Sequence, residues 1–297
     1  DAGANNVYDV TVQVSDGLLS TTQAIAVTVT PVNDNTPAIT SNGAGATAAV
    51  SIAENTTAVT TVTATDADLP AQTLTYSIVG GADAGKFTIN ASSGVLAFAT
   101  APDFETPTDA GTNNIYDVTV QVSDGLLTST QTIAVTVTPV NDNTPAITSN
   151  GAGATAAVSI AENTTAVTTV TATDADLPAQ TLSYSIVGGA DAGKFTINAS
   201  SGVLAFATAP DFETPTDVGT NNIYDVTVQV SDGLLSTTQA IAVTVTPVND
   251  NTPTITSNGA GATAAVSIAE NTTAVTTVTA TDADLPAQTL SYSIVGG

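Results

Sequence analysis

Short acidic motifs recur in a fixed order along this chain and contain most of the side chains that could do chemistry. Their carboxylates and the neighbouring asparagine amides are hard oxygen donors, of which Ca²⁺ takes about six to eight. The chain has no His, Cys or Met, so soft-metal sites and the usual nucleophile–base pairs have no residues to form them. In residues 145–252 the motifs are AEN at Glu162, DAD at Asp174 and Asp176, DFE at Asp211 and Glu213, SDG at Asp232 and NDN at Asp250.

The charge of the chain indicates the same kind of partner. It carries 27 Asp and Glu residues against 2 Lys and Arg, for a formal net charge of -25. Such a chain repels nucleic acid and anionic membrane surfaces, and we expect no nucleic-acid partner. Carboxylates ~4–5 Å apart at an effective dielectric near 20 repel by roughly 3–4 kcal/mol per pair. A bound cation removes that repulsion, and we expect Ca²⁺ as the cofactor.

The remaining composition is that of a folded β protein. Hydrophobic residues make up 42% of the chain, and many are Val, Ile or Thr in alternation, which favours strands over a disordered acidic tail. Without Cys, a small extracellular domain needs another staple, such as a metal ion. No stretch is apolar and long enough to span a bilayer, and we expect no membrane insertion within these residues.

A long internal repeat organises the sequence. PVNDNTP begins at Pro31, Pro139 and Pro247, and residues 37–144 and 145–252 differ at only five positions. A period of this length matches one independent domain. With the boundary after NDNT, we predict a C-terminal repeat fragment at 1–36, complete repeats at 37–144 and 145–252, and an N-terminal repeat fragment at 253–297. We interpret these residues as cut from a longer array.

Strand signals fill each complete repeat, and no amphipathic helix is visible. The alternation and the turn signals predict an all-β fold, an antiparallel seven-stranded β-sandwich of Greek-key type, with the domains stacked end to end. In 145–252 the expected strands are 156–162, 166–173, 181–188, 194–198, 203–207, 223–232 and 239–248.

In such a sandwich, alternate connections lie at opposite poles, so the acidic motifs separate. DAD should lie at the pole where the chain enters, and DFE and the NDN linker at the other pole. One repeat's DFE and NDN would then face the DAD of the next repeat. Asp191, Asp217 and Asp225 match no such motif, and we expect them on solvated faces. Tyr184, Phe195, Phe206 and Tyr224 are assigned to core or rim packing.

The ordered set AEN, DAD, DFE, SDG and NDNTP resembles the extracellular cadherin repeat, and this resemblance covers the whole chain. The near-identity of the repeats and the Ala/Thr/Asp-rich composition resemble the cadherin-like arrays of large bacterial surface proteins. The resemblance implies an extracellular or cell-surface location, and we expect a bacterial source. It also implies Ca²⁺ clusters shared by adjacent repeats of the same chain.

The resemblance implies metal ligands only where the motifs match. For the junction between 37–144 and 145–252 these are Glu54, Asp103, Glu105, Asn141, Asp142, Asn143 (through its carbonyl), Asp174, Asp176 and Asp232. For the following junction they are Glu162, Asp211, Glu213, Asn249, Asp250, Asn251, Asp282 and Asp284. The first junction keeps Asn33, Asp34, Asn35, Asp66, Asp68 and Asp124.

One departure from the family pattern affects the number of ions. The family's linker begins with Asp two residues before NDN, and this chain has Pro31, Pro139 or Pro247 there. We therefore expect two firmly bound ions at each junction, with a third weak or lost.

Three classes of function remain. The first is a calcium-rigidified structural array that forms an extracellular filament or the stalk of a surface adhesin. The alternative is that the repeats themselves act in cell adhesion by homophilic or host-ligand binding, and lateral self-association stays open. An enzyme is not expected, because the paired carboxylates are identical in every repeat and no insertion forms a cleft.

Overall fold

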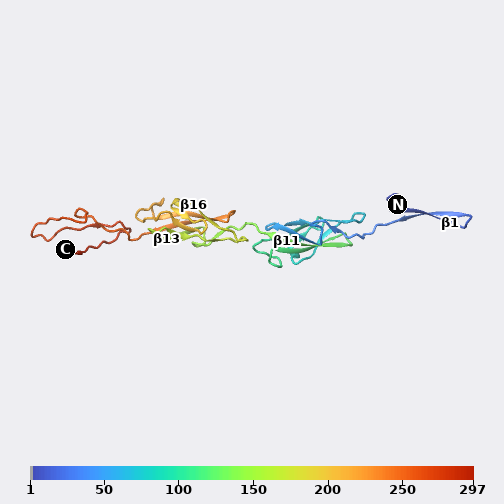
Figure 1. The fold of residues 1–297 in the computed structure, drawn as a ribbon, viewed down its shortest axis with the longest axis horizontal. Coiled ribbons are helices and arrows are strands. Elements are labelled where there is room, and N and C mark those ends of the chain that lie inside the picture. The colour runs from blue at the N-terminus through green and yellow to red at the C-terminus, as the bar shows by residue number, and fades with distance from the viewer. Residues whose placement is uncertain (1–2) are drawn as a thin grey trace. The chain divides into compact units, whose positions relative to one another are not determined.

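The structure is a computed structural model, and it describes residues 3–297. It divides into two compact units, Asp1–Val140 and Asn141–Gly297. Each unit contains one complete β-sandwich and a shorter segment of related sequence (Figure 1). The predicted repeat boundaries after residues 36, 144 and 252 stay predictions.

The complete sandwich of the second unit begins at Ala146, three residues after the last residue of the NDN linker. Its elements are β12 (Ala146–Ile147), β13 (Thr155–Ala161), β14 (Ala166–Thr169), β15 (Ala172–Thr173), β16 (Ser183–Gly188), the 3₁₀ turn η2 (Ala192–Lys194), β17 (Phe195–Ile197), β18 (Val203–Phe206), β19 (Ile223–Ser231) and β20 (Ser236–Thr246). The last 45 residues of this unit add only β21 (Thr254–Ile255) and β22 (Ala280–Thr281).

The first unit contains the same elements in the same order. Its sandwich consists of β3 (Ala38–Ile39), β4 (Thr47–Ala53), β5 (Ala58–Thr61), β6 (Ala64–Thr65), β7 (Thr75–Gly80), η1 (Ala84–Lys86), β8 (Phe87–Ile89), β9 (Val95–Phe98), β10 (Ile115–Ser123) and β11 (Thr128–Thr138). A hairpin of β1 (Val7–Ser15) and β2 (Ser20–Thr28) precedes it.

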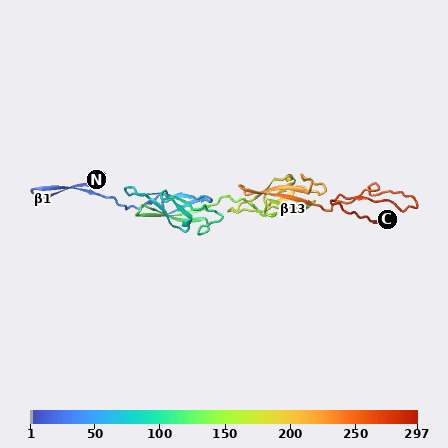
Figure 2. The ribbon, with the colours of Figure 1, turned by 180° about the vertical axis from the view of Figure 1, so that it is seen from behind.

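Two sheets form each sandwich. In the second unit the strand orders are β13-β20-β19-β16 and β14-β18-β17, and β12 pairs with β15. β13, labelled in Figures 1 and 2, is an edge strand and runs parallel to β20, whereas the pairs β19–β20 and β16–β19 are antiparallel. The prediction of tandem all-β sandwich domains is confirmed, with one parallel edge strand added to the antiparallel arrangement.

Alternation along the strands separates core from surface, as the sequence pattern predicts. In β19 every second residue is buried, beginning with Tyr224. The Tyr224 ring meets Phe206 edge-on with a centroid separation of 5.0 Å, and Phe195 lies 4.4 Å from Phe206. The Tyr224 hydroxyl accepts a hydrogen bond from Thr216 N at 3.1 Å. The predicted core role of these aromatic residues is confirmed, and Tyr224 also fixes the loop before its own strand.

The predicted strand 166–173 is divided in two by the sheets it joins. β14 pairs with β18, and β15 pairs with β12. Between them Val170 is fully buried, and its N–H donates to Gly202 O at 2.8 Å. Gly202 has φ +70, and a Cβ there would lie 2.1 Å from Val170 O. The hairpin turn that precedes β18 therefore requires glycine.

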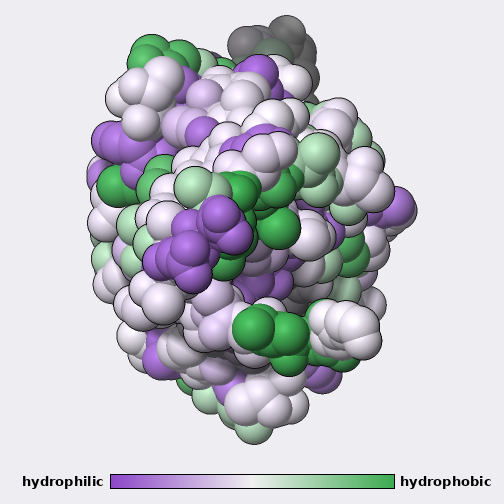
Figure 3. All heavy atoms as spheres, turned by 90° about the vertical axis from the view of Figure 1, so that its left-hand side faces the viewer, coloured by the Kyte–Doolittle hydropathy of each residue, from purple (hydrophilic) through white to green (hydrophobic). Residues whose placement is uncertain are grey.

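Identical sequences take different structures according to their partners. TAAVSIA is a strand at Thr47–Ala53 and at Thr155–Ala161, where it pairs with β11 and β20. The same seven residues at 263–269 form no strand and are paired with no strand in this structure. Their apolar side chains are consequently exposed, including Val266 and Ile268. On the face that Figure 3 presents, hydrophobic side chains lie scattered among polar ones.

Candidate metal centres

Three carboxylates meet at the N-terminal pole of the second unit's sandwich. Asp174 and Asp176 directly follow β15, and Asp232 directly follows β19. One oxygen of each lies within 4.8 Å of the others. Two strands far apart in sequence thus end at the same pole and bring DAD and SDG together. The corresponding trio in the first unit is Asp66, Asp68 and Asp124.

Hydrogen bonds use some of these oxygens and leave others without a partner. Asp232 Oδ1 accepts the N–H groups of Leu234 and Leu235, both at 2.7 Å. Asp174 Oδ1 accepts Asp176 N at 3.0 Å. The second carboxylate oxygen of Asp174 and of Asp232 is buried and has no hydrogen-bond partner. Two buried, unpaired anionic oxygens in one trio are costly unless a positive charge compensates them.

Asp176 connects the trio to the linker. It is 1% exposed, and its Oδ1 accepts Asn143 N at 3.1 Å and Asn143 Nδ2 at 2.8 Å. Burial tends to raise the pKa of this carboxyl, but the hydrogen bonds from Asn143 and from Asp142 N outweigh it and hold the pKa below its ordinary value. The side chain is therefore set up as an anion, which is the form that binds a cation.

In the first unit, the linker is held by the same kind of hydrogen bonds from an asparagine to the second aspartate of the DAD motif. Asn35 N donates to Asp68 Oδ2 at 3.0 Å, and the Asn35 side chain donates to Asp68 Oδ1. Hydrogen bonds from the Asn35 side chain, opposed by burial, lower the pKa of Asp68. Asp34 lies beside them and accepts from Asn35 Nδ2 at 3.1 Å. Asp66 Oδ2 is a further buried oxygen without a hydrogen-bond partner.

A second kind of trio lies at the C-terminal pole of the second unit's sandwich, made of Glu162, Glu213 and Asp250. Glu162, 2% exposed, accepts Val248 N at 2.6 Å and Phe212 N at 2.8 Å, so it ties the exit strand to the DFE loop. Glu213 Oε2 is buried without a hydrogen-bond partner.

The linker at this pole reaches the following segment of the same unit. Asp284, 1% exposed, accepts Asn251 N and Asn251 Nδ2, both at 2.9 Å. Glu213 Oε1 accepts Leu285 N at 2.9 Å. Acidic residues of one repeat, the linker and the DAD motif of the next segment therefore meet within a single unit. Asp282 is adjacent, and its Oδ1 accepts Asp284 N at 3.0 Å.

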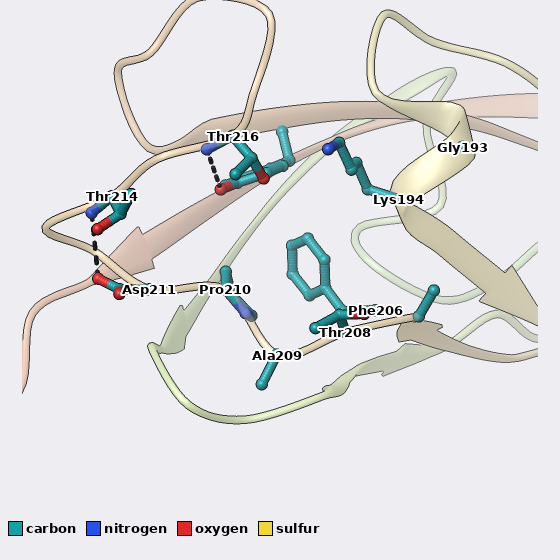
Figure 4. Close-up of a pocket in the computed structure, with 11 residues that line it drawn as sticks. Gly193, Lys194, Phe206, Thr208, Ala209, Pro210, Asp211, Thr214 and Thr216 are labelled. Carbon is teal, nitrogen blue, oxygen red and sulfur yellow. Dashed lines mark hydrogen bonds between the residues drawn. The ribbon is translucent and has the colours of Figure 1, made fainter.

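The DFE aspartate is close to this pole but outside the trio. Asp211 Oδ1 accepts Glu213 N at 2.9 Å and Thr214 N at 3.1 Å. It lines a pocket of about 430 Å³ together with Lys194 and Phe206 (Figure 4). Phe206 is only 4% exposed, so its ring serves as core at the base of this pocket. Asp211 thus shapes the loop that presents Glu213.

In the first unit, the residues equivalent to Glu162 and Asp211 make the same hydrogen bonds. Glu54 accepts Val140 N and Phe104 N, both at 2.7 Å. Asp103 Oδ1 accepts Glu105 N at 3.0 Å. The local geometry of the predicted ligands is therefore the same in both sandwiches.

Sequence reasoning placed two carboxylates wrongly. Asp191 and Asp217 were expected on solvated faces, but each is only 3% exposed. Asp191 accepts Val218 N at 2.8 Å and Asp225 N at 2.9 Å, whereas Asp217 accepts Asn221 N and Asn222 N. These carboxylates accept hydrogen bonds from backbone N–H groups in the long loop between β18 and β19. The expectation for Asp225 is correct, because its side chain is exposed.

The sequence did not single out one polar residue of this region. Gln180 lies four residues after Asp176 and contacts both Asp176 and the linker residue Asn141. The equivalent residues in the other DADLPAQ segments are Gln72 and Gln288. This recurrence of glutamine beside DAD was the sequence signal that could have identified it as part of the site.

These geometries define a class of protein, a tandem array of Greek-key β-sandwiches with acidic trios at the poles of each module. A family model described as the cadherin domain matches residues 48–138 and 156–246. The chain therefore belongs to the cadherin family, and the resemblance drawn from the motifs is confirmed.

Curated relatives agree with the family match. Human Protocadherin Fat 1 is 33% identical over 247 residues, which cover 79% of this chain and 5% of that protein. Human Cadherin EGF LAG seven-pass G-type receptor 2 is 31% identical over 307 residues, which cover 98% of this chain and 10% of that protein. The chain thus spans a tenth or less of the length of these relatives.

Solved structures show the same fold. Domains 3-6 of the Protocadherin Gamma B2 extracellular cadherin region match with a TM-score of 0.54 and 26% identity, over 83% of this chain and 60% of that chain. Domains 1-5 of the same protein match with a TM-score of 0.59 and 23% identity, over 96% and 53% of the two chains, and this similarity concerns the fold alone.

The comparisons also bear on three expectations. The relatives are named as protocadherins and cadherin receptors and not as enzymes, which confirms that this chain is not an enzyme. They are mammalian proteins, so nothing in them supports the expected bacterial origin. Among residues 3–297, no helix has the length and apolar character needed to cross a membrane.

Proposed function

We propose that this chain is a section of an extracellular cadherin array in which Ca²⁺ fixes the orientation of successive repeats, as in a filament or the stalk of a surface adhesin. The observation that carries this proposal is the set of buried carboxylate oxygens without hydrogen-bond partners, on Asp66, Asp174, Asp232 and Glu213. Each belongs to a trio of acidic side chains beside a linker.

Ca²⁺ suits these sites because it accepts many oxygen ligands in a flexible geometry. At the N-terminal pole of 145–252 the ligands would be the trio of Asp174, Asp176 and Asp232, with oxygens of Asn141 and Asn143. At the C-terminal pole they would be Glu162, Asp211, Glu213, Asn249, Asp250, Asn251, Asp282 and Asp284. By sequence identity of the repeats, the proposal extends to Glu54, Asp103, Glu105 and Asp142, and to Asn33, Asp34, Asn35, Asp66, Asp68 and Asp124.

Charge explains why the ion would matter for stiffness. The chain has a net charge of -25 and only two cationic side chains, so it offers almost no internal compensation for clustered carboxylates. Without Ca²⁺, these groups repel one another across each linker and favour separated repeats. With Ca²⁺, the same groups become shared ligands and hold the linker in one conformation.

Small-angle X-ray scattering of the full chain with calcium and with a chelator tests the proposal. The maximum dimension and the stiffness of the particle should both fall when the metal is removed. A magnesium-only sample is the matched control, because Mg²⁺ demands a smaller, near-octahedral site. An unchanged scattering curve after chelation would contradict calcium rigidification.

Lateral self-association is the second candidate function. It is favoured by one observation, a structural match to Protocadherin gammaB7 EC3-6, whose structure is described as a cis-dimer, with a TM-score of 0.55 and 26% identity. Sedimentation analysis at rising protein concentration distinguishes the two candidates. A calcium-dependent dimer would support association between chains. A monomer at every protein concentration would leave the structural array as the remaining candidate function.

A further inference from the structure

A glutamine side chain lies against the first asparagine of the linker in both examples within the second unit. Asn141 Nδ2 donates to Gln180 Oε1 at 3.0 Å, and Asn249 Nδ2 donates to Gln288 Oε1 at 2.8 Å. The spacing of 39 residues is the same in both pairs. The pairing is therefore a regular feature of the repeat and does not depend on one local arrangement.

The same glutamine also contacts the acidic trio. Gln180 Nε2 lies 3.4 Å from Asp176 Oδ2, and Gln288 Nε2 lies 3.3 Å from Asp284 Oδ2. Each glutamine therefore uses its acceptor for the linker asparagine and its donor for a carboxylate that is 1% exposed. It connects the linker to the carboxylates without supplying a charge.

This contact decides which end of the asparagine amide is available. Because Asn141 Nδ2 is bound to Gln180, Asn141 Oδ1 is left buried with no hydrogen-bond partner. Asn141 lies in the linker segment that precedes Asn143, which binds Asp176. A buried amide oxygen without a donor is a ligand position for a hard cation.

The Asn33 amide of the first unit satisfies its hydrogen bonds in the swapped orientation, with nitrogen and oxygen exchanged. The amide of Asn33 fits its surroundings when its nitrogen faces Asp68 Oδ2 at 3.2 Å and Asp124 Oδ2 at 3.1 Å. Its oxygen then accepts from Gln72 Nε2 at 3.2 Å. In this orientation the N–H groups of the asparagine take the place of a cation between two carboxylates.

We propose that Gln72, Gln180 and Gln288 are positioning residues that select which end of the linker asparagine amide faces the acidic trio. The proposal rests on the proposed function. With a cation in the trio, the glutamine accepts the asparagine N–H and turns the amide oxygen toward the metal. Without the cation both orientations are open, because Asn141 and Asn249 donate to their glutamines, whereas the Asn33 amide is satisfied with its N–H groups toward the carboxylates. A glutamine amide suits both states, because it carries a donor and an acceptor on one group.

Calcium titration of the chain with all three glutamines replaced by leucine tests the proposal. Leucine fills a similar volume and can hold neither orientation, so we expect the calcium affinity to fall about 10- to 100-fold, as for other residues that orient metal ligands. The matched control replaces Gln13, Gln121 and Gln229, which lie on strands β1, β10 and β19, by leucine. This control should retain the affinity of the unaltered chain.

Replacement by glutamate separates the positioning role from simple packing. The Gln72→Glu, Gln180→Glu and Gln288→Glu variant keeps an acceptor for the asparagine N–H, so its affinity should equal or exceed that of the unaltered chain. The side-chain amide signals of ¹⁵N-labelled Asn33, Asn141 and Asn249 give an independent readout. Their shifts on adding calcium should be large in the unaltered chain and the glutamate variant, and small in the leucine variant.

The outcomes distinguish this inference from the proposed function. Equal affinity and equal amide shifts in the leucine variant and the unaltered chain would overturn the positioning role while leaving calcium binding intact. Failure of the unaltered chain to bind calcium at all would overturn the proposed function. Should the leucine variant unfold, loss of affinity in the folded glutamate variant would overturn the inference by itself.

Discussion

Asp176 is ionised more readily than an ordinary aspartate, although it is almost completely buried. Burial raises its pKa, but hydrogen bonds from the side chain and backbone of Asn143 lower it more, and the pKa stays below its ordinary value. The same opposition lowers the pKa of Asp232 and of Asp284. Because the folded value lies below the unfolded one, the stabilisation from these groups is complete above about pH 4 and is lost as the pH falls through the folded pKa.

The pH dependence of calcium binding follows from these directions. Affinity should be nearly constant between about pH 7 and pH 5, and should fall only below about pH 4, where protons begin to compete for the carboxylates. Calcium titrations across this range, at fixed ionic strength, check the expectation. A loss of binding near pH 6 would contradict it, since the chain has no histidine to titrate there.

The substitution Asp232→Asn removes the charge of the side chain and keeps its size and its hydrogen-bond acceptor. The asparagine oxygen can still accept the N–H groups of Leu234 and Leu235, so the turn should persist. Removing one of three clustered charges should lower the calcium affinity of that junction by at least about tenfold. In chelator the same variant should be somewhat less stable than the unaltered chain, because the lowered pKa of Asp232 means that the fold favours its charged form.

Calcium titration and thermal unfolding with and without metal measure the two effects of Asp232→Asn. Asp225→Asn is the control, because the Asp225 side chain is exposed on a strand and outside every trio. An unchanged calcium affinity in the Asp232 variant would contradict the idea that its charge is present for a cation.

At the scale of elements, the loop between β18 and β19 is held by Asp191 and Asp217, neither of which follows a metal-binding motif. Asp191 lies next to η2, accepts Asp225 N from β19 and Val218 N from the loop, and donates its own N–H to Asp225 O at 3.0 Å. The Asp191 side chain therefore connects η2, strand β19 and the loop that contains Val218.

Replacing Asp191 by alanine removes two charge-assisted hydrogen bonds and leaves the partly buried N–H groups of Val218 and Asp225 unpaired. We expect a loss of roughly 2–4 kcal/mol from the free energy of unfolding of the repeat, both with and without calcium. Denaturant unfolding of Asp83→Ala plus Asp191→Ala, which alters both complete repeats, measures it. A loss seen only in calcium would instead place these residues in the metal centres.

The strands could be predicted because their signal is local. Alternating Val, Thr and Ile in IYDVTVQVS fixes both the strand and its buried face, and the ASSG turn before β18 marks the hairpin. The break between β14 and β15 could not be predicted, because it arises when one continuous apolar run pairs with two different sheets.

The site could be predicted only as far as its motifs are local. Asp174 and Asp176 are neighbours in sequence, but their approach to Asp232 depends on the order of the strands. The sequence did not single out Gln180, and it wrongly predicted a solvated face for Asp191, because their contacts are made 39 and 34 residues away in the chain. Side chains that hold a loop or orient a ligand have no spacing rule of their own.

At the scale of the whole molecule, the number of bound ions is the open quantity. Proline stands at positions 31, 139 and 247, where the family's linker has Asp, and we expect two firmly bound ions at each junction that has both of its halves. Isothermal titration of the chain should resolve a tight class and a weaker class of sites. Pro139→Asp should convert a weak site to a tight one, and an unchanged titration would show that this position does not set the count.

The parallel pairing of β13 with β20 has a consequence for force. The two strands run alongside each other from Thr155 opposite Ala240 to Ala161 opposite Thr246. Tension applied to the two ends of the repeat pulls β13 backward and β20 forward, so the ladder is loaded in shear and its hydrogen bonds must break together. Antiparallel neighbours pulled from one end would instead unzip one bond at a time. We therefore expect each complete repeat to resist tension applied along its length through this pair of strands.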